Sequence, residues 1–245
     1  MSLAKKIVII EDKTEKEVIR SDVSMDKLVG YFYKISNHNE LFKVGNGFLK
    51  QVEKGVKSFA FTSAGYKNSQ QKSVLGLCCF FDQNTNFKIA IISDHLMHGV
   101  FNDLVESSTQ NSYPMGEEGD VLNYKSFYHH FDFIEYKEFQ KFYENHIYSK
   151  NFDAEVSKIL AQYDVILWDI PEMEAMKKLP HFHSRMAHFY DSMTVIVAQN
   201  TTSGKQIEFI KKFFSNYNIN LSGVLFDTPD IEDKPKRKKF LGIFG

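Results

Sequence analysis

The chain has 245 residues, of which 43% are hydrophobic and 25% are charged, so it can form one sizeable core or at most two small domains. The formal net charge of −1 argues against a nucleic-acid-binding protein, and contact with any anionic surface must come from a local patch. The sequence has no secretory signal and no run of 18 apolar residues, and its two cysteines, Cys78 and Cys79, are adjacent. We therefore expect a cytoplasmic protein without disulfides.

Short apolar runs alternate with helical patterns along the chain. The runs predicted to be strands buried on both faces are 7–10, 58–62, 89–92, 165–170, 194–198 and 221–226. Residues 25–53 indicate one or two helices, and residues 74–81 are apolar nearly all round, as in a helix covered by its neighbours. Buried strands separated by helices predict an α/β fold with a mostly parallel, doubly wound sheet.

Two later helices are indicated by apolar spacing and by their caps. Asp153 is a suitable N-cap for a helix with apolar residues at 156, 159, 160 and 163. Ser203 and Gln206 form the pattern of a capping box. Residues 107–124 are rich in Ser, Asn, Gly and acids and predict a loop.

The segment after the second predicted strand has features of a phosphate-binding loop. Lys72 and Ser73 are expected to open the following helix, as the lysine and hydroxyl residue of such a loop do. In a working loop, glycines let backbone N–H groups surround the phosphates. Tyr66 and Gln71 stand where those glycines are expected, and a side chain at these positions obstructs the close approach of phosphate.

The order and spacing of several motifs resemble the bacterial tyrosine autokinases (BY-kinases) of capsule and exopolysaccharide export, and more broadly the ParA/MinD-type partition and septum-site ATPases. The matching segments, spread over about residues 55–228, are Thr62-Ser63-Ala64, Lys72-Ser73, Ser93-Asp94-His95, residues 163–171, residues 191–199, Thr201-Thr202 and residues 223–226. The resemblance implies a P-loop NTPase-like fold. It also implies that Lys72, Ser73, Asp94 and Asp169 would contact the cofactor if ATP and Mg²⁺ bind.

The chain also departs from the pattern of these kinases. Ser93 and His95 replace the two acids of their Asp-x-Asp motif, Asp227 replaces the asparagine that reads adenine, and the C-terminal tyrosine cluster is missing. Phosphoryl transfer depends on positioning and charge neutralisation around Mg²⁺, so these losses together predict a pseudo-ATPase. The remaining Lys72, Ser73 and Asp169 also have simple structural explanations, as a solvated lysine, a helix-start residue and a helix cap.

The resemblance and its departures together predict a non-catalytic scaffold or regulatory protein in polysaccharide biosynthesis or export, or in cell-envelope organisation. Such a protein needs no cofactor and has no catalytic residues, and the sequence indicates no metal site. The alternative is an active, deviant P-loop ATPase that acts in polysaccharide export or in positioning membrane machinery.

The C-terminal residues 234–245 read Lys-Pro-Lys-Arg-Lys-Lys-Phe-Leu-Gly-Ile-Phe-Gly. A basic cluster beside bulky apolar residues is typical of an interfacial membrane anchor, and it also suits a peptide that docks on a partner or a solvated tail. The residues expected to contact a membrane or partner are Lys236, Arg237, Lys238, Lys239, Phe240, Leu241, Ile243 and Phe244.

We therefore expect three parts in the chain. Residues 1–54 form an N-terminal strand and a helical extension packed on the core, residues 55–228 the ATPase-like domain, and residues 229–245 the tail. The expected partners are proteins, as a homodimer or a heteromer with a membrane-bound complex. The tail would add contact with the inner-membrane surface, and no nucleic acid is expected.

Overall fold

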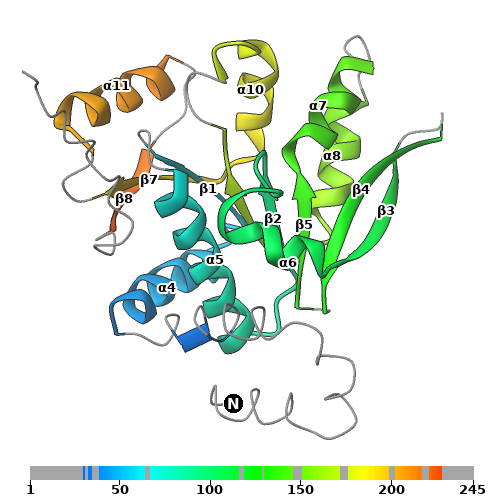
Figure 1. Cartoon of the computed structure of the whole chain (residues 1–245). Helices are drawn as coiled ribbons and strands as arrows, with labels where there is room; N and C mark the ends of the chain where they lie inside the picture. The colour runs from blue at the N-terminus through cyan, green and yellow to red at the C-terminus, as the bar shows by residue number, and fades with distance from the viewer. Residues whose placement is uncertain are drawn as a thin grey trace, which may run out of the picture.

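A computed structural model describes residues 30, 33–34, 39–63, 67–115, 119–128, 130–145, 151–171, 176–198, 202–216 and 221–227. The predicted strand at 7–10, the loop residue Tyr66 and the tail from 229 onward lie outside these residues. Within them the chain forms one eight-stranded sheet with helices on both faces (Figure 1). The predicted α/β fold with a mostly parallel sheet is confirmed.

The strand order across the sheet is β3-β4-β5-β2-β6-β1-β7-β8. The strands are β1 (Ser58–Ser63), β2 (Ile89–Ser93), β3 (Thr109–Met115), β4 (Asp120–Phe127), β5 (Phe131–Glu135), β6 (Val165–Asp169), β7 (Ser192–Ala198) and β8 (Leu221–Asp227). From β5 to β8 every neighbouring pair is parallel, whereas β4 runs antiparallel to both β5 and β3. The carboxyl ends of the six parallel strands therefore meet at one edge of the sheet.

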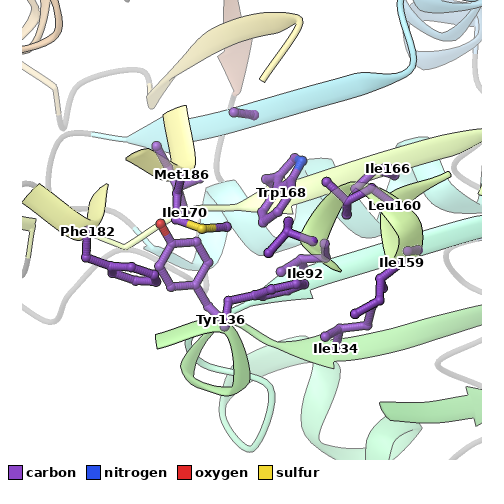
Figure 2. Close-up of a cluster of buried hydrophobic side chains, with 14 of the residues drawn as sticks. Ile92, Ile134, Tyr136, Ile159, Leu160, Ile166, Trp168, Ile170, Phe182 and Met186 are labelled. Carbon is purple, nitrogen blue, oxygen red and sulfur yellow. The ribbon is translucent and has the colours of Figure 1, made fainter. Parts of the chain in front are cut away.

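Helices cover the two faces of the sheet and enclose two hydrophobic cores. The helices are α4 (Asn39–Val52), α5 (Lys67–Asn84), α6 (Asn102–Glu106), α7 (Tyr136–Asn145), α8 (Phe152–Leu160), α10 (Pro180–Met186) and α11 (Gly204–Ser215). The first core lies under α4, α5 and α6, and the second lies under α7, α8, α10 and α11. Figure 2 shows the second core, where Tyr136, Trp168 and Phe182 supply large aromatic side chains.

Most of the elements expected from apolar patterns are present at or near the predicted bounds. Strands β1, β2 and β6 are buried at every residue, as strands covered on both faces require. The apolar stretch 74–81 lies inside α5 and is fully buried. Ser203 and Gln206 form both hydrogen bonds of the predicted capping box.

The prediction of a loop at 107–124 is wrong, because this segment contains β3 and most of β4. The two strands form an antiparallel pair at the edge of the sheet. Most of their outward positions are polar, although Val121 is also exposed, while Tyr113, Met115 and Leu122 point into the core. Polar residues on an edge strand discourage it from pairing with other chains. Here they gave the segment the composition of a loop, so the strand was not predicted.

The N-cap predicted for α8 is also wrong. The helix begins at Phe152 with Asn151 as its N-cap residue. The Asp153 carboxylate instead accepts hydrogen bonds from the Arg185 guanidinium of α10, at 2.7 and 3.2 Å. Asp153 therefore links two helices on one face of the sheet.

Candidate functional site

Polar side chains gather where three central parallel strands end. Ser63 is the last residue of β1, Ser93 of β2 and Asp169 of β6. Ser93 and Asp169 are paired directly in the sheet, so they share one position along its carboxyl edge. Ligands of open parallel sheets bind beyond this edge, which makes it the place to look for a site.

The helix that follows β1 begins at Lys67, earlier than the motif had indicated. Lys72 and Ser73 therefore lie in the second turn of α5, half-buried, and do not open the helix. Only residues 64–66 separate the end of β1 from the start of α5. A phosphate-binding loop occupies the longer span of Gly-x-x-x-x-Gly-Lys between strand and helix, so this connection is too short to reproduce it.

Lys67, at the start of α5, links the two acids that the sequence had singled out. Its Nζ donates to Asp94 Oδ1 at 3.2 Å and to the carbonyl oxygen of Ile170 at 2.9 Å. The same nitrogen lies 3.1 Å from Asp169 Oδ1, in an ion pair rather than a well-aligned hydrogen bond. Because the Lys67 side chain is only 16% exposed, this ammonium group neutralises the acids from within the protein.

The Asp169 carboxylate is completely buried and both of its oxygens have protein neighbours. Oδ1 faces Lys67, and Oδ2 accepts a hydrogen bond of 2.5 Å from Ser93 Oγ. Ser93 Oγ also accepts from the backbone N–H of His95 at 3.1 Å. Burial raises the pKa of Asp169, while the Lys67 ammonium and the Ser93 hydroxyl oppose that rise.

Replacing Ser93 by Ala is expected to lower the free energy of unfolding by about 1.5–3 kcal/mol, the range for a hydrogen bond to a charged group. The variant leaves Asp169 Oδ2 buried without its donor. Chemical denaturation followed by circular dichroism measures the effect. Ser107→Ala, which removes an exposed hydroxyl bonded to the Asp103 carbonyl oxygen, is the control and should change stability by less than about 0.5 kcal/mol. Equal effects in the two variants would contradict the role given to Ser93.

Two buried glutamines in the first turns of α5 close the same edge. Gln70 Nε2 donates to the carbonyl oxygens of Phe61 and Ile170, at 2.8 and 3.0 Å. Its Oε1 accepts from Ser63 Oγ at 2.9 Å. The amide of Gln71, which stands where a loop glycine was expected, donates to the His95 carbonyl oxygen at 3.2 Å. These amides tie α5 to the ends of the strands.

With Lys67 paired to both acids, the described residues do not form a binding site for Mg²⁺ and ATP. The two carboxylates that would approach the metal, Asp94 and Asp169, are bound to the Lys67 ammonium, and Ser93 offers no charge. No cluster of three or more His, Cys, Asp or Glu residues able to hold a metal ion occurs in the described ranges.

Of the four residues predicted to contact a nucleotide, Asp94 and Asp169 lie together at Lys67, which the motif spacing had passed over. Lys72 and Ser73 lie further along α5, and contact with a nucleotide stays a prediction. The signal that could have found Lys67 is that it is the first cationic residue after β1. The proposed contact residues of the tail, from Lys236 to Phe244, lie outside the described residues. None of the helices described is long and apolar enough to cross a bilayer.

Comparison with known proteins gives a likeness of fold. No protein-family model matches the chain, and no curated protein matches its sequence. The kinase domain of VpsO is similar in structure, with 14% identity and a TM-score of 0.52 over 85% of this chain and 100% of that domain. The chimeric protein CapA2B2 is similar with 14% identity and a TM-score of 0.51, over 79% of this chain and 87% of the other.

The kinase domain of the Escherichia coli tyrosine kinase ETK is also similar, with 13% identity and a TM-score of 0.49 over 69% of this chain and 66% of that domain. At such low identity the first two likenesses show a shared fold. The resemblance in fold to bacterial tyrosine kinase domains, expected from the order of the motifs, is therefore confirmed.

Proposed function

We propose that this protein is a non-catalytic scaffold or regulatory protein with the fold of a P-loop kinase. The observation that carries the proposal is the Lys67 ammonium, which lies between Asp94 and Asp169 at the carboxyl ends of β2 and β6. A positive charge supplied by the protein stands next to the acids that would otherwise approach a metal ion.

Transfer of a phosphoryl group requires Mg²⁺ held by the protein and donors that surround the phosphates. To admit Mg²⁺, this site would have to release Lys67 from both acids. The completely buried Asp169 would then lose its only ion-pair partner among the described residues. Breaking such a pair costs about 3–5 kcal/mol, and this cost reduces the apparent affinity for the nucleotide because the open state is rarely populated.

The resemblance of the motifs and the kinase-like fold favour a role in polysaccharide biosynthesis or export, or in organisation of the cell envelope. In such a role the protein acts through contacts with other proteins in the cytoplasm. A homodimer or a complex with a membrane-bound partner would use the carboxyl edge of the sheet, where no nucleotide has to be admitted or released.

Isothermal titration calorimetry with Mg²⁺ and ATP tests this proposal. The wild-type chain is expected to give no binding heat at micromolar ATP and no release of phosphate. The variants Lys67→Ala and Lys72→Ala distinguish the two lysines, after circular dichroism has shown that each is folded. Micromolar affinity that is lost in either variant would contradict the proposal and favour an active, deviant ATPase.

A further inference from the structure

A groove of about 400 Å³ opens beside the closed site. Its floor is formed by β4 and β5 and its wall by α6 and the segment that follows β2. Glu135, the last residue of β5, is paired in the sheet with Ser93, which is paired in turn with Asp169. The groove therefore begins one strand away from the Lys67 site, on the same carboxyl edge.

The lining of the groove combines apolar residues with two acids, Glu135 and Glu138, and one lysine, Lys125, whose Nζ donates to the Val105 carbonyl oxygen at 3.2 Å. The buried apolar residues Leu96 and Val105 lie in the wall, and the buried Phe133 lies in the floor. Glu138 Oε2 accepts hydrogen bonds from Asn123. The groove is large enough for one or two bulky side chains, since ligand pockets begin at roughly 300 Å³.

Glu135 supplies a carboxylate that the rest of the described chain leaves available. It is half-buried in the groove, and within the described ranges it makes no hydrogen bond or close ion pair. Its interaction with Lys141 is a longer-range attraction, because the Lys141 ammonium is bonded to Glu138. An acid beside an apolar wall is complementary to a basic residue followed by a bulky apolar one.

One segment of this chain has that composition. Residues 236–239 are Lys-Arg-Lys-Lys, and Phe240-Leu241 follow directly. The last strand before this segment is β8, which ends at Asp227. An unbroken series of parallel pairs links β8 to β5. The ends of β8 and β5 therefore lie at the same edge, with β2, β6, β1 and β7 between them (Figure 1).

The chain between Asp227 and the basic cluster has the right length to reach the groove. Five strand-to-strand steps separate β8 from β5, which is about 24 Å at roughly 4.8 Å per step. The eight residues 228–235 span up to about 26–29 Å when extended. Lys236 can then reach Glu135.

We propose that the C-terminal segment 236–244 of the same chain binds in this groove, with its basic residues at Glu135 and with Phe240 or Leu241 on the apolar wall. This contact goes beyond the proposed scaffold function and does not depend on whether the Lys67 site admits a nucleotide.

A fluorescent peptide corresponding to residues 234–245, followed by fluorescence anisotropy, tests the proposal in the full-length chain. The host is a variant whose own tail cannot compete, with Lys236, Arg237, Lys238 and Lys239 all replaced by Glu. We expect this host to bind the peptide at least tenfold more tightly than the wild-type chain does. Adding Glu135→Lys to the host should weaken binding at least tenfold.

Two controls make the result specific. Adding Glu144→Gln to the host, which neutralises another acid on α7 that is bonded to Gln140, should change binding less than twofold. A peptide with its basic residues replaced by Glu should bind the Glu135→Lys variant better than it binds the unmodified groove. Equal binding of the native peptide to the host with and without the Glu135→Lys substitution would overturn the proposal.

The membrane alternative is separated by co-sedimentation with vesicles that contain anionic phospholipid. If the groove holds the tail, Glu135→Lys in the otherwise wild-type chain frees it and should increase the pelleted fraction at least twofold. Peptide that binds vesicles but not the host protein, together with equal pelleting of the two chains, would assign the tail to the membrane and overturn the proposal.

Discussion

Replacing Lys67 by Met is expected to lower the free energy of unfolding by about 3–5 kcal/mol near neutral pH, as for other buried ion pairs that lose one partner. Asp169 is 0% exposed, and its Oδ1 atom faces Lys67. The variant keeps most of the side-chain volume but leaves the carboxylate without the ammonium group. Urea denaturation followed by circular dichroism measures the change.

The effect of Lys67→Met should depend on pH in a defined direction. Burial raises the pKa of Asp169, and Lys67 opposes that rise, so the variant should have a still higher folded-state pKa. Between the pKa of an unfolded aspartate and the higher pKa of Asp169 in the folded variant, only the folded state keeps the carboxyl proton. The free energy of unfolding therefore falls as the pH rises through the folded-state pKa. The variant should therefore be less destabilised near pH 5 than near pH 8.

Lys158→Met is the matched control for this pair of measurements. Lys158 is 69% exposed and forms a surface ion pair with Glu155, so its loss should cost less than about 1 kcal/mol. If Lys67→Met is no more destabilising than this control, or if its effect does not diminish toward acidic pH, Lys67 does not neutralise Asp169.

The second large effect is expected at Gly45, where α4 packs against α5. A Cβ atom at this position would lie 2.5 Å from Cγ of the buried Phe80 ring. Gly45→Ala must therefore displace a ring that is itself fully enclosed. We expect a loss of about 1–3 kcal/mol, the range for overpacking a well-filled core.

Gly47 on the same helix gives the opposite result. A Cβ atom there meets nothing within 4 Å, so Gly47→Ala should stabilise the protein by about 0.5–1 kcal/mol through a lower loss of backbone entropy. Thermal or urea unfolding of both variants measures the difference. Similar stabilities for the two would show that α4 does not pack on α5 as described, and would weaken the prediction that residues 1–54 include an extension packed on the core.

The sequence predicted the central part of the fold because its strands are covered on both sides. In β6 the residues Val165 to Trp168 form a continuous apolar run, and the position of α5 in the core follows from its apolar stretch 74–81. The β3–β4 pair was missed because an edge strand needs few apolar residues. Tyr113 and Leu122 are buried, but the polar residues around them matched the composition of a loop.

The site was predicted only in part, for a different physical reason. Asp94 follows β2 and Asp169 is the last residue of β6, and topology alone brings residues at the ends of such strands together. The start of α5 depends on how few residues the β1 connection uses, and motif spacing presupposed a longer loop. Lys67 is therefore the lysine at the start of α5, where the motif had indicated Lys72.

A structure of the protein crystallised with Mg²⁺ and a non-hydrolysable ATP analogue tests the central claim most directly. We expect the Lys67 Nζ atom to lie within ion-pair distance of Asp94 and Asp169, with no nucleotide beside them. A map with Mg²⁺ between the two acids, Lys67 turned onto a phosphate and residues 64–73 enclosing the nucleotide would contradict it.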